Sequence, residues 1–263
     1  MNKNIGTVHY EKKGHICTIT INKPENLNIL DLPMISNLTK AMEMAEEDLE
    51  IRCVVLTAAG GKIFTAGGDI GVEKTLKGES AKAFAQQGKA CMEAIYNHRV
   101  PVICAVEGHG LGGGLELVLV SDMTVISKTS KLGAPTVKLA ATPGWGSTQT
   151  LPRVVGISRA KELMYTGRLI EAEEALQLGL VEFVTDKGKA LEKAYELAEQ
   201  IAKMAPIAME NMKIAINGSD ALNLEQGYEL DTNIFVSCHN TEDKVEGMSA
   251  FLEKREPKPY RRR

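Results

Sequence analysis

The chain has 263 residues, of which 44% are hydrophobic and 25% charged, and its formal net charge is −3. This is the composition of a globular protein with one substantial core; the acidic balance argues against nucleic acid as a partner, and no apolar run reaches the ~18 residues of a membrane span. The N-terminus lacks a secretory apolar segment and the five scattered cysteines form no C-x-x-C pair, so we expect a cytoplasmic protein without zinc site or disulfides.

The first half of the chain alternates short apolar strands with helical patterns. In chain order, the spacing of apolar residues predicts a hairpin formed by a strand near residue 8 and a strand at 16–21, a helix over 34–49 and a strand at 53–57. It then predicts a helix over 84–95, a strand at 101–106, a helix after the glycines that follow this strand, and a strand at 124–127. Such alternation predicts an α/β protein with a largely parallel sheet.

The second half is predicted to be almost entirely helical from about Ser158 onward. Gly167 and Gly179 stand where helices should end, and Thr241 with the two following acids should open the last helix. We expect a core over residues 1–195 and a helical C-terminal region over 196–263. The basic run 261–263 is expected to be a solvated tail.

Two glycine-containing loops follow predicted strands, one at residues 62–70 and the other at 108–116. Ligand sites gather at the carboxyl ends of parallel strands, so both loops should face one crevice. Three consecutive glycines at 112–114 cannot stabilise a helix, because each costs about 1 kcal/mol relative to alanine. They do offer bare N–H groups at a helix N-terminus, where an anion or oxyanion can bind.

Glu116 follows these glycines and could carry out proton transfer beside such an oxyanion site. The alternative is an acid favoured at a helix N-terminus by the helix dipole. Its apolar neighbours favour the catalytic interpretation. The loop matches neither the dinucleotide fingerprint G-x-G-x-x-G nor a phosphate-binding loop, and the chain contains no G-x-S-x-G of a serine hydrolase.

Taken together, the motifs resemble those of the enoyl-CoA hydratase/isomerase family, the crotonase superfamily, in family order across nearly the whole chain. The matching strings are F-T-A-G-G-D-I at 64–70, G-H-G-L-G-G-G-L-E-L at 108–117, L-G-A-P at 132–135, P-G-W-G-S-T-Q-T-L at 143–151, V-G-I-S-R-A-K-E-L at 155–163, T-G-R-L-I-E-A-E-E-A at 166–175, L-G-L-V at 178–181 and E-G-M-S-A-F-L-E-K-R at 246–255.

This resemblance implies a spiral of repeated ββα units with a helical C-terminal region that mediates trimerisation, in a homotrimer or hexamer. It implies a coenzyme A thioester as substrate, with no metal and no further cofactor. The N–H groups of Gly68 and Gly113 would hold the thioester oxygen, and Glu116 matches the first catalytic glutamate of the hydratases.

The resemblance also implies a set of substrate-binding residues. Asn26, Leu27, Asn28, Ala66, Asp69 and Ile70 would line the coenzyme A pocket, mostly through backbone; Thr136, Gly144 and Trp145 would lie near the acyl group; Phe251 and Lys254 would reach the coenzyme A of a neighbouring subunit. Two of these have a plain alternative. Lys254 could lie on a solvated helix face, and Trp145 could either shape the pocket for a flat or cyclic acyl group or simply fill core space.

One position departs from the family pattern: Thr136 stands where the second hydratase glutamate should follow the G-x-P string. A hydroxyl cannot replace a carboxylate as acid or base at neutral pH. Either Glu116 works alone, or another group compensates, or the reaction is not simple hydration. The leading hypothesis is hydration of a conjugated enoyl- or dienoyl-CoA by Glu116 alone. Double-bond isomerisation, which needs one base, is the first alternative; decarboxylation and thioester hydrolysis stay open. A noncatalytic coenzyme A-binding or RNA-associated scaffold is disfavoured by the acidic charge and the intact glycine loops.

Overall fold

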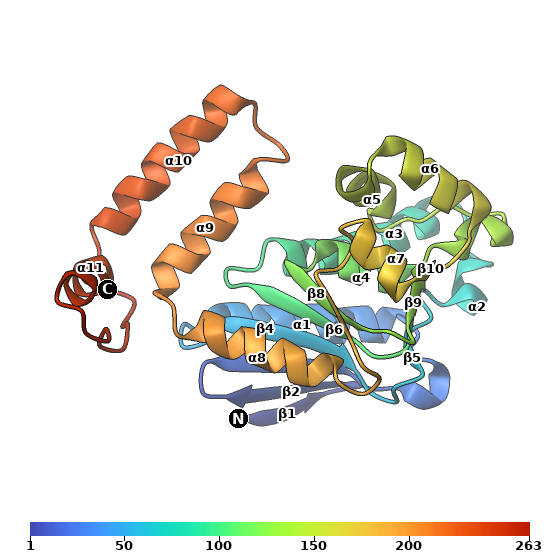
Figure 1. Ribbon diagram of the computed structural model, residues 1–263. Coiled ribbons are helices and arrows are strands. Elements are labelled where there is room, and N and C mark those ends of the chain that lie inside the picture. The colour runs from blue at the N-terminus through green and yellow to red at the C-terminus, as the bar shows by residue number, and fades with distance from the viewer.

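A seven-stranded sheet forms the centre of the protein in the computed structural model, which describes residues 1–263 (Figure 1). Its strands, in spatial order, are β1 (Asn2–Ile5), β2 (Val8–Lys13), β3 (Ile16–Ile21), β4 (Cys53–Ala58), β6 (Val102–Val106), β8 (Met123–Ser127) and β11 (Phe183–Thr185). The hairpin strands pair antiparallel, and from β3 onward every pair is parallel. The predicted hairpin and parallel sheet are confirmed.

A second, smaller sheet lies at one end of the first. It contains β5 (Ile63–Thr65), β7 (His109–Leu111), β9 (Lys131–Gly133) and β10 (Ile170–Glu171), in the order β10-β9-β7-β5. Strands β4, β6 and β8 lie in the large sheet, and each is followed by a strand of the small sheet and then by helix. This repeat is the predicted ββα spiral, and it turns the chain through the same small sheet three times.

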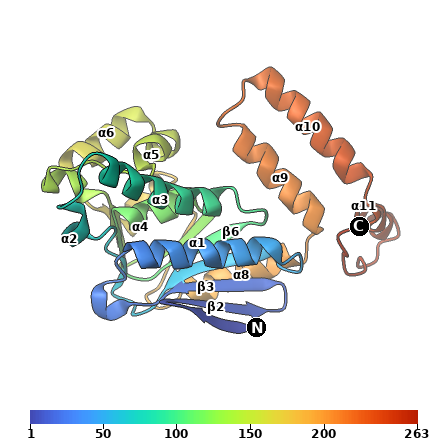
Figure 2. The ribbon, with the colours of Figure 1, turned by 180° about the vertical axis from the view of Figure 1, so that it is seen from behind.

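Helices cover both faces of the large sheet. In chain order, the helices up to residue 202 are α1 (Leu32–Glu47), α2 (Ile70–Glu73), α3 (Glu79–Tyr96), α4 (Gly113–Val120), α5 (Ser147–Val155), α6 (Ile157–Thr166), α7 (Ala172–Gln177) and α8 (Ala190–Ala202), with 3-10 turns at Pro24–Asn26 and Pro135–Leu139. Figure 2 shows α1 in front of the sheet and α8 behind it. No helix is both long and apolar enough to cross a bilayer.

Helix α8 belongs to the core. Its alanines Ala190, Ala194 and Ala198 are fully buried against the β4–β6–β8 face, with Val55 and Ile103 among their neighbours. Small side chains let the helix backbone approach the sheet closely. The expected division after residue 195 falls inside this helix, so residues 196–202 pack with the core.

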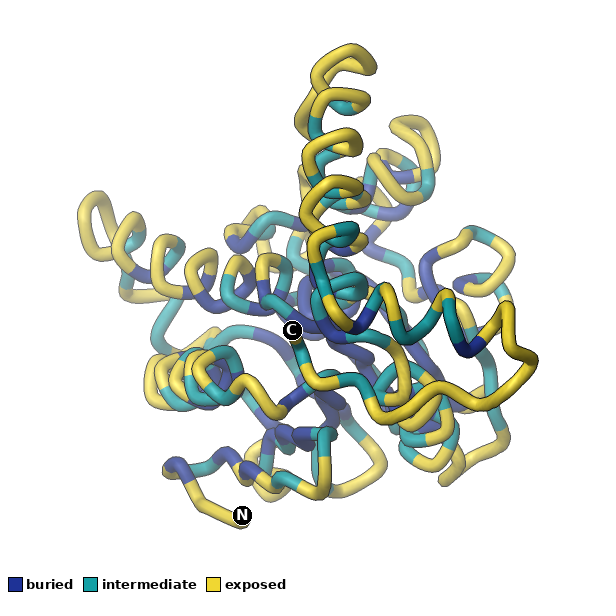
Figure 3. The backbone as a smooth tube through the Cα atoms, turned by 90° about the vertical axis from the view of Figure 1, so that its left-hand side faces the viewer, coloured by how far each residue is buried: buried dark blue, intermediate teal, exposed yellow.

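The remaining helices form a C-terminal arm, defined here as α9 (Pro206–Gly218), α10 (Leu224–His239) and α11 (Glu242–Leu252), which extends away from the sheet (Figure 1). Thr241 caps α11 as predicted, accepting a bond from the Lys244 N–H at 3.1 Å. In Figure 3 this arm faces the viewer, and most of its residues are exposed or half-buried. Helix α10 contains no buried residue. The arm's exposed apolar side chains include Met212, Ile214, Ile216, Leu224, Tyr228, Phe235, Val236, Val245, Met248, Phe251 and Leu252.

The expectation of a solvated basic tail is wrong. Asp243, which is buried at the start of α11, accepts hydrogen bonds from the N–H groups of Arg261 and Arg262, both at 2.8 Å. The Arg262 guanidinium also pairs with Glu210 of α9. The tail therefore packs back on the arm, because buried carboxylates require donors and the basic run supplies them. The expectation of an all-helical second half also missed β10 and β11.

Candidate active site

The site forms where three neighbouring strands of the small sheet end. Strands β5, β7 and β9 run parallel, so the segments that follow them emerge at one edge. These segments are residues 66–70, 112–116 and 134–136, which contain the predicted oxyanion glycines, Glu116 and Thr136. The three motifs that are far apart in the sequence are thus brought together by short strands.

Close contact between the two glycine loops depends on Gly67, whose φ is +90°. A Cβ atom there would lie 2.7 Å from the Leu111 carbonyl oxygen and 3.0 Å from the Gly113 nitrogen. Only glycine combines this backbone angle with so near a neighbour. The contact places Gly68 and Gly113 on the wall of one cavity. Gly113 is the first residue of α4, so its N–H has no partner within the helix.

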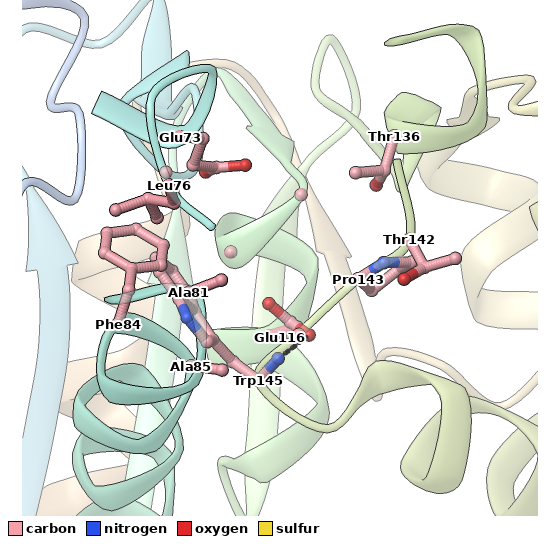
Figure 4. A pocket seen from close by; sticks show the side chains of 14 residues that line it. Glu73, Leu76, Ala81, Phe84, Ala85, Glu116, Thr136, Thr142, Pro143 and Trp145 are labelled. Carbon is pink, nitrogen blue, oxygen red and sulfur yellow. Dashed lines mark hydrogen bonds between the residues drawn. The ribbon is translucent and has the colours of Figure 1, made fainter. Parts of the chain in front are cut away.

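The cavity has a volume of about 340 Å³ (Figure 4). Its lining includes the predicted residues Gly68, Gly113, Glu116, Thr136, Gly144 and Trp145, together with Glu73, Leu76, Ala81, Phe84, Ala85, Gly112, Thr142 and Pro143. One side is therefore apolar, and the polar groups are concentrated around Glu116 and the glycines. Such a mixture suits an acyl chain attached to a reacting carbonyl group.

Glu116 is held by the segment that begins α5. Its Oε1 accepts bonds from the Trp145 N–H at 3.1 Å, the Ser147 N–H at 3.1 Å and the Ser147 hydroxyl at 2.9 Å. The residue is only 4% exposed, and its carboxylate does not cap its own helix. Burial raises the pKa of Glu116, while these three bonds act to lower it. Because all three donors reach Oε1, Oε2 is left to exchange a proton.

Sequence reasoning missed Ser147 as a partner of Glu116. It is the first residue of α5, directly after Gly146 at φ +122°. The serine is 31 positions from the glutamate and lies within the P-G-W-G-S-T-Q string. The string marked residues 143–151 as part of a family motif. The hydrogen bond between Ser147 and Glu116 could not be read from it, because the fold brings the two residues together.

Glu73 is a second carboxyl group in the cavity, and it was not among the predicted residues. It is half-buried at the end of α2 and lines the same cavity as Glu116. Figure 4 shows Glu73 and Thr136 on opposite sides, with Glu116 between and below them. Burial raises the pKa of Glu73, and the nearby Asp69 raises it further. The only sign of Glu73 in the sequence was that an acidic residue stands one helical turn after Asp69.

Trp145 divides two cavities. Its ring is 5% exposed and lies between α3 and α4, where a Cβ on Gly88 or Gly113 would collide with the indole. The Phe84 ring packs against it with centroids 5.6 Å apart. A neighbouring cavity of about 550 Å³ shares Pro143, Gly144 and Trp145 with the first. Trp145 is thus part of the hydrophobic core and also lines both cavities.

The predicted coenzyme A segments run beside one another. The Ala66 N–H donates to the Leu27 carbonyl at 3.1 Å, and the Leu30 N–H donates to the Gly67 carbonyl at 2.8 Å. Asn26 ends the short 3-10 turn just before Leu27. Hydrogen bonds therefore join the loop before α1 to the loop that carries Gly68.

Two of these predicted residues have side chains engaged within the protein. Asn28 is fully buried and donates to the carbonyls of Ala59 and Ile63 at 2.9 and 3.1 Å. Asp69 caps α2 through the N–H groups of Gly71 and Val72. The Asn28 N–H is also engaged, with the Lys23 carbonyl at 3.0 Å, so Asn28 holds this loop in place and presents no exposed surface to a ligand. Leu27 and Ile70, by contrast, expose about half of their apolar side chains.

Phe251 and Lys254 lie on and just after α11, at the far end of the arm from α2 (Figure 1). Both are exposed, and neither lines the cavity of their own chain. Contact with coenzyme A would require a second copy of the chain. No group of three or more His, Cys, Asp or Glu side chains in the structure is arranged to hold a metal ion.

Comparison with known proteins decides the family. The sequence model of the enoyl-CoA hydratase/isomerase family matches residues 11–261. This chain belongs to that family. The short-chain-enoyl-CoA hydratase of Clostridium acetobutylicum is 35% identical over 259 residues, covering 98% of this chain and 99% of the relative. The crotonyl-CoA hydratase of Syntrophomonas wolfei is 34% identical, covering 93% and 94%.

A solved structure of the same family confirms the fold. The crystal structure of an enoyl-CoA hydratase from Bacillus anthracis superposes with a TM-score of 0.94 at 36% sequence identity. It covers 98% of this chain and 100% of the other. The resemblance inferred from the motif strings and the ββα spiral that it implied are therefore both confirmed.

Proposed function

We propose that this enoyl-CoA hydratase/isomerase family member adds water to a conjugated enoyl-CoA thioester. The observation that carries the proposal is the fixed Glu116 carboxylate in the same cavity as Gly68 and Gly113. Two of its close relatives are named as hydratases of short-chain enoyl-CoA and crotonyl-CoA, which supports the same reaction here.

In the proposed reaction the thioester oxygen binds to the N–H groups of Gly68 and Gly113. Water attacks the β-carbon, and Oε2 of Glu116 takes the proton that the water loses. The double-bond electrons move onto the thioester oxygen as an enolate, which the two N–H groups stabilise. Loss of one such donor typically costs roughly 3–4 kcal/mol in the transition state. Return of a proton to the α-carbon completes the addition.

The acyl group is expected to be compact. Trp145 closes the inner end of the 340 Å³ cavity, and Phe84 extends the aromatic surface beside it. A flat or cyclic acyl group, or a short linear one, would fit against these rings, whereas a long chain would meet the indole. The coenzyme A part would lie along the paired loops that contain Leu27 and Ile70.

The active form is proposed to be a homotrimer or hexamer built through the arm. The many large apolar side chains exposed on the arm support this, because burying them in a subunit interface would remove their apolar surface from water. In such an assembly Phe251 and Lys254 would reach a neighbouring subunit's coenzyme A. A cytoplasmic location is part of the proposal, supported by five cysteines that are free thiols. Sedimentation equilibrium tests the assembly, and a monomer at working concentration would contradict it.

Double-bond isomerisation is the second candidate, and Thr136 is the observation that favours it. Isomerisation moves one proton from the α-carbon to the γ-carbon or back, which a single carboxylate can do. With no carboxylate at position 136, the wall opposite α2 offers only the hydroxyls of Thr136 and Thr142.

A panel of acyl-CoA thioesters separates these reactions. Crotonyl-CoA, its β,γ-unsaturated isomer and a cyclic enoyl-CoA are incubated with the protein, and the products are analysed by mass spectrometry. Hydration adds the mass of one water to the conjugated substrates. Conversion of the β,γ-isomer without a mass change indicates isomerisation, and release of free coenzyme A indicates hydrolysis. Coenzyme A binding without turnover of any of the three would contradict the proposed function.

A further inference from the structure

We propose that Glu73 is a second catalytic residue, the acid that protonates the α-carbon of the acyl group after water has added. The inference rests on the proposed hydration and names the group that supplies its last proton. It assigns to α2 the acid that the family pattern would have placed at position 136.

The first support is the position of the Glu73 carboxyl group. Asp69 caps α2 and thereby fixes the turn that directs Glu73 into the cavity. A Cβ atom on Gly68 would collide with Glu73 Oε1, so this oxygen adjoins one of the two oxyanion residues. The α-carbon of a thioester is bonded to the carbonyl carbon held there. Glu73 is therefore beside the atom that must gain a proton.

The second support is the contrast in bonding between the two carboxyl groups. Glu116 receives three donors on one oxygen, which favours its ionised form. No hydrogen bond or ion pair within the protein contributes to the state of Glu73, and the groups that face it, Asp69 and Glu116, are both acids. Burial, and after it the charge of Asp69, raise the pKa of Glu73 and favour its neutral form, and Glu73 in turn raises the pKa of Glu116. Two carboxyls in environments this different are suited to separate base and acid roles.

A water proton passes to Glu116 as the oxygen–carbon bond forms at the β-carbon, and the enolate collapses as the Glu73 proton passes to the α-carbon. Glu73 is then ionised and Glu116 is neutral. A proton moves from Glu116 to Glu73 through water when the product leaves, which restores the starting state.

The test compares Glu73→Gln with wild type and with the matched control Glu79→Gln, which removes an exposed carboxylate at the start of α3 outside the cavity. For crotonyl-CoA, Glu73→Gln is expected to lower kcat by about 10²-fold while KM changes by less than about threefold. The control should match wild type. Butyryl-CoA, which has no double bond, reports whether each variant still folds and binds.

Several results would overturn the assignment. A kcat that falls less than about tenfold, or a change confined to KM, would make Glu73 a recognition group at most. Loss of butyryl-CoA binding in Glu73→Gln would show that its effect is structural. If wild type itself adds no water to any conjugated thioester, the proposed hydratase function fails. If wild type is active and Glu73→Gln is equally active, only the role assigned to Glu73 fails.

A pH profile gives a readout that a structural role would not change. Glu73 must be protonated to act as the acid, so wild-type kcat should fall on the alkaline side as Glu73, which faces the acids Asp69 and Glu116, becomes ionised. Glutamine does not titrate. Glu73→Gln should therefore lose this alkaline limb and keep the acidic limb that belongs to Glu116. An unchanged alkaline limb would overturn the proposal.

Discussion

The two sides of the cavity differ in how firmly they hold their carboxyl groups. On the side formed by α4 and α5, Glu116 is almost fully buried and receives three donors within 3.1 Å. On the α2 side, Glu73 is half-buried, receives no hydrogen bond from the protein and lies near the charge of Asp69. The two carboxyl groups thus differ in the donors that stabilise their ionised forms, although burial raises both pKa values above the ordinary glutamate value.

The largest effect is expected at the fixed carboxylate. Glu116→Gln keeps an oxygen for the three donors but cannot transfer a proton, so turnover should fall ~10²–10⁴-fold with coenzyme A affinity retained. Steady-state kinetics with crotonyl-CoA and a binding titration with butyryl-CoA check this. Near-normal turnover in a correctly assembled protein would remove Glu116 from the mechanism.

The thermal stability of the same variant tests how burial of the Glu116 carboxylate affects the fold. Because burial raises the pKa of Glu116 in the folded state, ionisation of this group destabilises the fold at pH values above that pKa. The uncharged glutamine removes this effect. The thermal midpoint of Glu116→Gln at neutral pH is therefore expected to equal or exceed that of wild type. As the pH falls through the raised pKa of Glu116, the wild-type midpoint should rise relative to the midpoint of the variant.

The next effect concerns substrate choice. Trp145→Ala removes the ring between the two cavities but keeps the backbone N–H that bonds Glu116. The kcat/KM ratio of a long-chain to a short-chain enoyl-CoA should rise by about tenfold or more. Loss of the buried ring should also lower stability by roughly 3–5 kcal/mol, so assays are run well below the midpoint. Trp145→Phe, which keeps an aromatic ring, is the matched control and should change the ratio less.

A smaller effect is expected from the Ser147 hydroxyl, which donates a hydrogen bond to the Glu116 carboxylate. Ser147→Ala deletes one of three bonds that lower the pKa of Glu116, so that pKa should rise. Glu116 must be ionised to accept a proton, and the acidic limb of kcat/KM should therefore move to higher pH. At neutral pH the loss should stay below about tenfold, because two backbone donors remain. An acidic limb that moves to lower pH would contradict this role of Ser147.

The sequence predicted the core and the glycine loops for clear physical reasons. Long apolar runs such as β4 and β6 can only be buried strands, and glycines 112–114 could not belong to a helix interior. The small sheet could not be predicted, because β5, β7 and β9 are three residues each and have no measurable periodicity. Yet these strands bring the three motifs together.

The missed site residues have the same physical origin. Ser147 contacts Glu116 across 31 positions, and Glu73 meets the cavity only because the Gly67 contact draws its loop against α4. Neither relation is local, so neither residue carries a pattern that identifies its partner. The docking of Arg262 on Glu210 is also a long-range contact, which explains why the basic run resembled a solvated tail.

The central claim is that the chemistry depends on carboxyl groups and not on the hydroxyl at position 136. Its most direct test measures kcat for Thr136→Ala and Glu116→Gln side by side on the best wild-type substrate. The account predicts a loss of less than about tenfold for Thr136→Ala, since a hydroxyl that positions water contributes about 1 kcal/mol, against at least ~10²-fold for Glu116→Gln. Equal losses with unchanged butyryl-CoA binding would contradict it and would assign Thr136 an essential part in the reaction.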